Sequence, residues 1–344
     1  MSTDYRSPQT SYPLQQSGFE FGITGYNLTF YQWSDENNFV LDQRGFNTWL
    51  RGTASRFLQP NDPRLLLNTT VSRIAYSNDS VTLHLNDNTC ITAAYAVCTA
   101  SLGVLQNDLI TFSPPLPHWK RLPLNQFQMG TYTKIFFQFN ETFWPRDTQF
   151  LLYADPVVRG YYPVWQSLDA PGFLPGSHIL FVTVVHDESY RVEAQSDAAT
   201  KAEALAVLRT MFPNTTVPEP TAFMYPRWSL EPWARGSYSN WPVGMTLERH
   251  QNLRANVERL FFAGEHTSAQ YYGFLHGAWF EGQDAGERIA SLLGYGCVNA
   301  AEDEAEAGAC GELVRYEELY GTTAAGQFGV ANGWDVSSFV TYGL

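Results

Sequence analysis

The segment from Arg259 to Gly294 predicts a strand, a tight turn and a helix in immediate succession, and it reads RLFFAGEHTSAQYYGFLHGAWFEGQDAGERIASLLG. Its apolar run, Leu260 to Ala263, stops at Gly264 and is followed at once by Glu265. A strand that leads through small residues into a helix aims free N–H groups and the positive end of the helix dipole at one place. We therefore expect α/β construction, with an anion or a polarised carbonyl group at this junction.

The residues around this junction suit a flat ring that carries a polyol. Gly273, Gly277 and Ala278 are small enough to let a ring approach the backbone. A second negative charge at Glu265 would oppose an anion, so this carboxylate is better suited to accept hydrogen bonds from sugar hydroxyls. The same pattern also occurs as ordinary α/β construction without a ligand, and the residues alone leave both interpretations open.

Length and composition predict two domains and argue against nucleic acid as a partner. The 344 residues exceed what one core usually serves, and 44% of them are hydrophobic. The formal net charge of -13 argues against binding to nucleic acid. The sequence has no apolar run of about 20 residues, so we expect no membrane span. Its N-terminus also lacks the basic and then apolar order of a secretory signal.

Other short patterns bear on the compartment and on metals. Five Asn-x-Ser/Thr sequons favour a secreted glycoprotein, and they lie at Asn27, Asn68, Asn78, Asn140 and Asn214. The cysteines form no CxxC pair, so we expect no metal site. Cys297 and Cys310 could close a small loop, or both could remain free thiols.

Residues 295–344 are more acidic than the rest of the chain. Arg315 is their basic residue, against the acids Glu302, Asp303, Glu304, Glu306, Glu312, Glu317, Glu318 and Asp335. This composition predicts a solvated, partly disordered extension.

Hydrophobic periodicity predicts the main elements of the remaining chain. Strands are expected at Val81–Leu85, within Ala94–Leu105 and at Ile179–Val185, the last as a central strand. Helices are expected within Asp42–Leu58, from about Ser196 with Ala202, Leu205, Leu208 and Phe212 on one face, and after Gly277. The prolines of Thr111–Trp119 predict a crossing between domains.

The sequence TYTKIFFQF places a lysine among aromatic residues. In a strand the odd positions, Thr131 to Phe139, form one face, while Tyr132, Lys134, Phe136 and Gln138 form the other. An ammonium group on such a face is usually an edge or snorkelling residue. A functional role for Lys134 is the alternative.

Several segments resemble the flavin-dependent amine oxidases, and among these the polyamine oxidases. They occur in that family's order, cover Leu41 to Leu293, and read LDQRGFNTWL, DPRLLLNTTVSRIAYS, TASLGVLQNDLITFSPPLPHWK, TYTKIFFQF, FWP, RGYYPVWQ, YPRWSLEPWARGSYSNWPVG and FFAGEHTS. The resemblance implies a two-domain α/β (α+β) fold and FAD as the cofactor. The early substrate-binding acids of the family have no match in this chain, and Ala234 stands where the family has an aromatic residue near the flavin.

The resemblance also implies roles for individual residues in holding FAD. Glu265, after Gly264, would bind the sugar-like part of the cofactor, and Gly273, Phe274 and Leu275 would lie against the flavin ring. Val71 matches the position whose backbone meets the adenine, and Trp228 matches an aromatic residue beside the flavin. Without the resemblance, both would be interpreted as ordinary core residues.

The activity implied by the resemblance is oxidation of an amine or polyamine to an imine or aldehyde, with O2 reduced to H2O2. Lys134 matches the family lysine that reaches the flavin through a water molecule. Tyr238 and Phe274 match an aromatic pair that sandwiches the amine, although related plant enzymes have a tyrosine in place of Phe274. The expected partners are therefore a small-molecule amine and O2.

The sequence contains no G-x-G-x-x-G turn, which in the family holds the FAD pyrophosphate. We therefore expect an N-terminally truncated two-domain fold that holds FAD weakly on its own. Its expected parts are 1–40, a remnant of the substrate domain; 41–110 and 236–294, the FAD-binding domain; 111–235, the mixed-sheet substrate domain; and 295–344. The alternatives are a non-catalytic remnant or amine-binding protein without flavin, and a secreted glycoprotein with a structural role.

Overall fold

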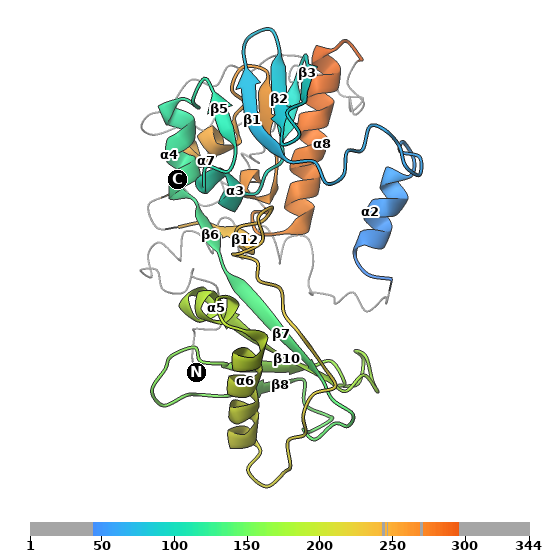
Figure 1. The fold of residues 1–344 in the computed structure, drawn as a ribbon, viewed down its shortest axis with the longest axis vertical. Helices are drawn as coiled ribbons and strands as arrows, with labels where there is room; N and C mark the ends of the chain where they lie inside the picture. Colours follow the sequence, from blue (N-terminus) through green and yellow to red (C-terminus); the bar gives the residue numbers. More distant parts are fainter. Residues whose placement is uncertain (1–43, 243–244, 246, 269–270, 296–344) are drawn as a thin grey trace, which may run out of the picture.

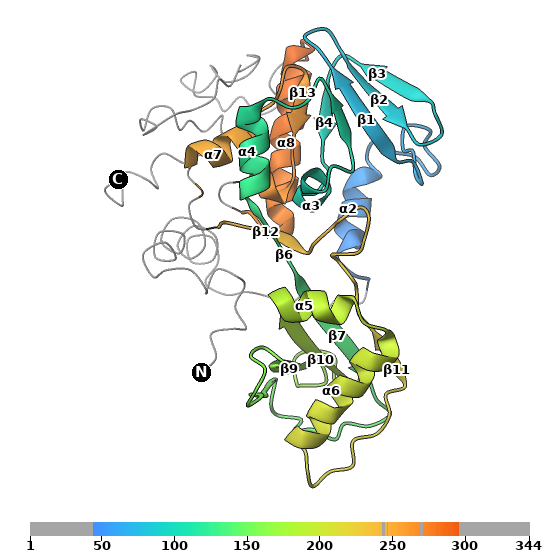
Figure 2. The same cartoon turned by 60° about the vertical axis from the view of Figure 1, so that its left-hand side comes forward.

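The computed structural model describes residues 44–242, 245, 247–268 and 271–295, which form two lobes (Figures 1 and 2). Two extended segments pass between the lobes. One holds β6 (Gln128–Gly130) and β7 (Tyr132–Gln138). The other leads from β11 (Ala222–Met224) to β12 (Tyr238–Asn240). Strands β6 and β12 pair antiparallel between the lobes. The predictions for 1–40, Cys297, Cys310 and the acidic extension after Tyr295 lie outside the described residues.

The upper lobe of Figure 1 contains two small sheets. The four-stranded sheet has the order β3-β2-β1-β5 and consists of β1 (Val71–Tyr76), β2 (Val81–Leu85), β3 (Cys90–Ala93) and β5 (Thr111–Ser113). The second sheet pairs β4 (Ala96–Cys98) in parallel with β13 (Leu260–Phe262). The predicted strand at Val81–Leu85 is confirmed, and its period-two pattern buries the two end residues.

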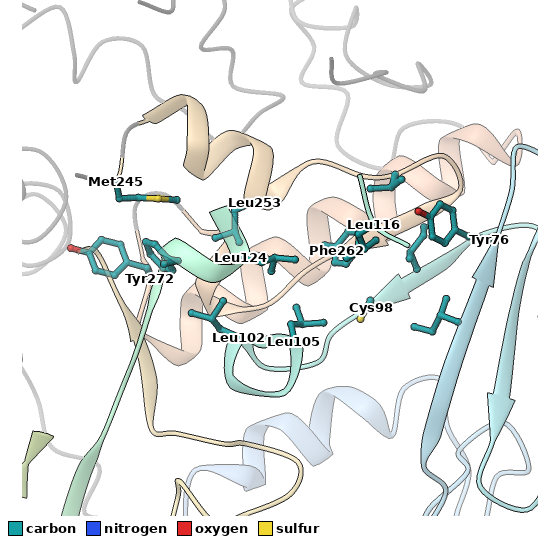
Figure 3. Packing of buried hydrophobic residues seen from close by; sticks show 14 of the residues in the cluster. Tyr76, Cys98, Leu102, Leu105, Leu116, Leu124, Met245, Leu253, Phe262 and Tyr272 are labelled. Atoms are coloured by element: carbon teal, nitrogen blue, oxygen red, sulfur yellow. The ribbon is translucent and has the colours of Figure 1, made fainter. Parts of the chain in front are cut away.

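Helices cover these sheets and enclose the first hydrophobic core. They are α2 (Asn47–Ala54), α3 (Leu102–Gln106), α4 (His118–Gln126), α7 (Leu247–Arg254), the 3-10 helix η4 (Glu265–Thr267) and α8 (Leu275–Leu292). Figure 3 shows that α3, α4, α7 and β13 each contribute to this core, through side chains such as Leu102, Leu124, Leu253 and Phe262. Helix α2 buries none of its residues, although Trp49 contacts Trp279 of α8 with ring centroids 5.0 Å apart.

In the described part of the chain, the lower lobe has one antiparallel sheet and two helices. Its strand order is β11-β7-β10-β9-β8, and the new bounds are β8 (Phe150–Leu152), β9 (Val164–Ser167) and β10 (Ile179–Val185). This order confirms the predicted central position of β10. The helices are α5 (His186–Glu193) and α6 (Asp197–Met211). Ser196 caps α6 by accepting a hydrogen bond from the N–H of Ala199, so the predicted start of this helix is confirmed.

The predicted faces of β7 and α6 bury a second hydrophobic core. Ile135 and Phe137 of β7 are fully buried in it, together with Leu205 and Leu208 of α6. Ala202 is exposed, contrary to the prediction, because Ala204 occupies the buried face of the helix.

The structure contradicts the predicted crossing at Thr111–Trp119. Thr111 to Ser113 form β5 and pair in parallel with β1, and His118 begins α4. The apolar side chains of Leu116, Leu124 and Phe127 join the first core, which is why this segment stays in the upper lobe. The chain instead crosses between the lobes at β6 and β7, beyond the predicted boundary at residue 111.

Two other predicted elements are shorter than expected. Within Ala94–Leu105, only Ala96–Cys98 is a strand, because Ser101 caps the start of α3 and ends the extended run. The helix expected within Asp42–Leu58 is described only as Asn47–Ala54. Among the described residues, no helix has the length and apolar character needed to cross a membrane.

The sequons that can be described lie in exposed turns or bends. These are Asn68, Asn78, Asn140 and Asn214. Attachment of sugar at these positions remains a prediction.

Candidate functional site

The junction after β13 is built by close packing around Gly264. Leu260 to Phe262 are all buried beside β4, and Gly264 precedes η4. A Cβ atom at Gly264 would lie 2.7 Å from Cε1 of His266, so a larger residue here would displace the buried His266 ring. The strand, the glycine and the following acid therefore lie as the sequence predicts.

The carboxylate of Glu265 connects β12 to the loop before α8. It accepts hydrogen bonds from the N–H of Ser239 at 3.0 Å, from the hydroxyl of Ser239 at 2.6 Å and from the N–H of Gly273 at 2.5 Å. Burial raises the pKa of Glu265, and these hydrogen bonds act in the opposite direction. The side chain expected to bind a sugar thus also fixes the chain around Gly273.

Gly273 has a left-handed backbone and lies against Tyr238. Its φ is +79°, and a Cβ atom there would lie 3.1 Å from the backbone oxygen of Ser239 and 3.2 Å from the ring of Tyr238. Phe274 follows as the N-cap residue of α8. These contacts bring three of the predicted site residues, Gly273, Phe274 and Tyr238, to one place.

The N-terminus of α8 lacks a side-chain cap from its N-cap residue. Phe274 provides no side-chain cap, and the first turn of this 18-residue helix contains no acid. Leu275 is 65% exposed, so the helix end faces outward. The N–H groups and the dipole of a helix N-terminus favour negative charge on a neighbouring group.

Lys134 lies on the aromatic face of β7, as the sequence predicts. Its Nζ atom is 5.1 Å from the ring centroid of Phe181 and 5.8 Å from that of Tyr132. Burial lowers the pKa of Lys134 because a charged ammonium group loses hydration in this position. The ring of Tyr132 is in turn 5.9 Å from that of Tyr238.

These contacts form a continuous path from the lower to the upper lobe. It runs from Lys134 through Tyr132 and Tyr238 to Gly273, and Glu265 binds the N–H of Gly273. Sequence reasoning named Tyr132 only as a neighbour of Lys134. Its period-two position on β7 was the available signal, but its contact with Tyr238 depends on the tertiary structure.

Trp228 and Val71 are less closely connected to this path. Trp228 lies in a turn, packs edge-on against Trp233 with centroids 5.7 Å apart, and accepts a hydrogen bond from the N–H of Gly236 through its backbone oxygen. Val71 begins β1 and packs against the first core. Among the described residues, Val71 makes none of the contacts that form the path from Lys134 to Glu265.

The residues present fit the ring of a flavin. The uncapped N-terminus of α8 suits the electron-rich edge of the ring, and Lys134 provides a donor on the aromatic face below. A carboxylate has about four acceptor positions, and three hydrogen bonds from the protein already reach Glu265. Its fit to a sugar hydroxyl is therefore limited to the remaining position. Within the described residues, no group of three or more His, Cys, Asp or Glu side chains could hold a metal ion.

The two lobes and this junction define an α/β protein of the class that binds a nucleotide-type cofactor at the end of a parallel strand pair. Residues 19–290 match the model of the flavin containing amine oxidoreductase family, and the chain belongs to that family. This finding confirms the predicted family and fold class.

Curated relatives are similar over most of this chain. Polyamine oxidase 7 of Oryza sativa subsp. japonica is 45% identical over 262 residues, which are 74% of this chain and 55% of the relative. Polyamine oxidase 1 of Zea mays is 45% identical over 268 residues, which are 75% of this chain and 53% of the relative. The chain thus spans about half the length of these relatives.

Solved structures support the fold. A putrescine oxidase bound to putrescine superposes with a TM-score of 0.56 at 19% identity, covering 70% of this chain and 51% of that chain. Cyclohexylamine oxidase from Brevibacterium oxydans IH-35A gives a TM-score of 0.54 at 24% identity, covering 67% of this chain and 49% of that chain.

Proposed function

We propose that the chain acts in the FAD-dependent oxidation of an amine, with a polyamine as the substrate class. The amine loses two electrons and two protons to form a C=N bond, and O2 gains them as H2O2. Water then hydrolyses the imine to an aldehyde and releases the nitrogen as a free amine. The observation that carries this proposal is the contact path from Lys134 through Tyr132 and Tyr238 to Gly273, beside the uncapped N-terminus of α8. The similarity to polyamine oxidases of Oryza sativa and Zea mays supports polyamines as the substrate class.

FAD, when bound, supplies the two-electron chemistry, and the residues of this chain prepare the amine for it. Because burial lowers the pKa of Lys134, its Nζ atom can exchange a proton more easily than an exposed lysine. The rings of Tyr132 and Tyr238 provide an apolar wall along which an alkylamine chain can lie, and Phe274 follows Gly273, which lies against Tyr238. This wall also excludes water from the reacting carbon.

The two lobes have separate tasks in this proposal. The upper lobe, which contains Glu265 and α8, holds the cofactor. The lower lobe presents Lys134 and the aromatic face of β7 to the substrate. In this proposal we assign residues 111–127 to the cofactor-holding lobe, because they pack with the upper lobe, and we keep the other domain boundaries between residues 44 and 295 as proposals.

The test measures peroxide formation by residues 1–344 with FAD kept in excess. We expect spermine to give peroxide only when FAD is present, and Lys134→Met to slow this reaction by at least ~10-fold, since a positioned proton-transfer group contributes about 10² or more. Lys201→Met on α6 is the control and should keep the rate. Calorimetric binding of spermine without FAD-dependent peroxide would instead identify an amine-binding protein and would exclude the proposed oxidation by this chain.

A further inference from the structure

Trp228 lies outside regular helices and strands, and one buried residue holds the chain on both sides of it. That residue is Glu193, the last residue of α5, which is 1% exposed. Its backbone oxygen accepts a hydrogen bond from Nε of Arg227 at 3.0 Å. Its carboxylate oxygen Oε2 accepts hydrogen bonds from the N–H of Ser229 at 2.8 Å and from the hydroxyl of Ser229. The residues before and after Trp228 are therefore both attached to Glu193.

The other carboxylate oxygen of Glu193 connects to the strand that carries Lys134. Oε1 accepts a hydrogen bond from the hydroxyl of Thr133, which also contacts the hydroxyl of Ser189. Thr133 is fully buried on the core face of β7, so Lys134, the next residue, projects from the opposite face. One side chain thus bridges the segment of Trp228 and the strand of Lys134.

The carboxylate of Glu193 is buried and is held by hydrogen bonds to the two segments that it joins. Burying a charged group is costly unless hydrogen bonds compensate for the lost hydration. The described residues include no ion pair to the Glu193 side chain within 4.0 Å, and its partners are hydroxyls and one backbone N–H. An apolar residue would fill the core at lower cost, but it would leave the turn around Trp228 without its anchor.

We propose that Glu193 is a positioning residue that fixes the indole of Trp228 relative to Lys134. This inference rests on the proposed function, in which Lys134 acts on the amine, and on the family resemblance, which implies that Trp228 lies beside the flavin ring. Glu193 itself touches neither substrate nor cofactor. Its contribution is to keep two chain segments, separated by almost a hundred residues, in one arrangement before the cofactor binds.

The test follows the position of Trp228 without using the cofactor. The chain is labelled with 5-fluorotryptophan, and the fluorine resonance of Trp228 is assigned by its loss in Trp228→Phe. We expect Glu193→Ala to displace and broaden this resonance, with Trp233 following because the two rings are in contact. The resonances of Trp144 and Trp165, which lie in the second core, should stay in place.

A conservative variant separates positioning from general stability. In Glu193→Gln the amide oxygen can still accept from Ser229, and the amide NH2 can donate to Thr133, whose hydroxyl then donates to Ser189. The Trp228 resonance should therefore return to its original place. The control is Asp187→Ala on the same helix, where the carboxylate is 90% exposed. If Glu193→Ala does not fold, Ser229→Ala provides the same measurement with the carboxylate retained.

The outcomes distinguish this inference from the proposed oxidation. An unmoved Trp228 resonance in folded Glu193→Ala would overturn the positioning role, and so would an equal displacement of all tryptophan resonances. Thr133→Val should also move the Trp228 resonance, and its failure to do so would overturn the bridge to the strand of Lys134. The fluorine measurement is made without flavin, so its result does not depend on oxidase activity. A chain without oxidase activity would refute the proposed function and would leave the positioning role of Glu193 open to this test.

Discussion

At the residue scale, the buried carboxylates of Glu193 and Glu265 differ in the donors that reach them. Each oxygen of Glu265 accepts a backbone N–H, from Ser239 on Oε1 and from Gly273 on Oε2. In Glu193 only Oε2 accepts a backbone N–H, because Oε1 is bound by the hydroxyl of Thr133. A hydroxyl can reverse its role and accept a hydrogen bond, whereas a backbone N–H cannot.

This difference predicts unequal losses of stability for the same substitution at the two positions. In Glu265→Gln, either orientation of the amide places its NH2 group against a backbone N–H. That buried N–H then has no acceptor, which lowers the free energy of unfolding by about 1–3 kcal/mol. Glu193→Gln should cost less because Thr133 can reverse its hydroxyl. Urea unfolding at neutral pH measures both variants. Equal losses would show that the direction of these hydrogen bonds does not matter.

At the scale of one element, the glycines of α8 have different surroundings. A Cβ atom at Gly277 would lie 2.2 Å from the backbone oxygen of Tyr271, so the first turn of the helix packs directly against the loop before it. A Cβ atom at Gly282 would meet nothing within 4 Å, and this residue is exposed. The close packing at Gly277 fixes the helix N-terminus that we assign to the flavin ring.

Alanine substitutions should therefore change stability in opposite directions. Gly277→Ala forces the helix away from Tyr271, and overpacking of this kind costs about 1–3 kcal/mol. Gly282→Ala should stabilise the chain by roughly 0.5–1 kcal/mol, because it removes the entropic cost of glycine inside a helix. Thermal and urea unfolding of the two variants give the comparison. A destabilised Gly282→Ala would mean that α8 has a partner at this face.

At the scale of the whole molecule, two buried histidines connect acid stability to the upper lobe. His250 of α7 and His266 of η4 are almost fully buried, and Nε2 of His250 lies 3.1 Å from the backbone oxygen of His266. Burial lowers the pKa of each from 6.5 to about 3, and the nearby Lys120 acts in the same direction. Between about pH 3 and pH 6.5, both imidazoles are therefore neutral in the folded chain and protonated in the unfolded chain.

The sign of the resulting pH dependence follows from this difference. Between pH 6.5 and about 3 the unfolded state binds more protons, so stability falls as the pH drops through this window. Each histidine should cost about 2 kcal/mol between pH 7 and pH 5. Urea unfolding at both pH values measures the loss, and His266→Asn should reduce it. The exposed His118→Gln is the control, and a similar reduction there would contradict the assignment to buried histidines.

Features that depend on near neighbours along the chain are predictable from the printed residues. The two faces of β7, the Ser196 cap of α6, and the strand, Gly264 and Glu265 junction all follow from periodicity or from local backbone chemistry. The family and fold class also followed from the order of the segments that resemble it. These features are short-range, so the residues that cause them can be identified in the printed sequence.

Contacts between distant residues depend instead on how the whole chain packs. β5 remains in the upper lobe because it pairs with β1, and Glu265 binds Ser239 rather than standing free for a ligand. The contact of Tyr132 with Tyr238 and the bridge made by Glu193 likewise join segments far apart in the chain. Such pairings depend on how the two lobes and their cores pack, and packing is a property of the whole molecule that no local pattern encodes.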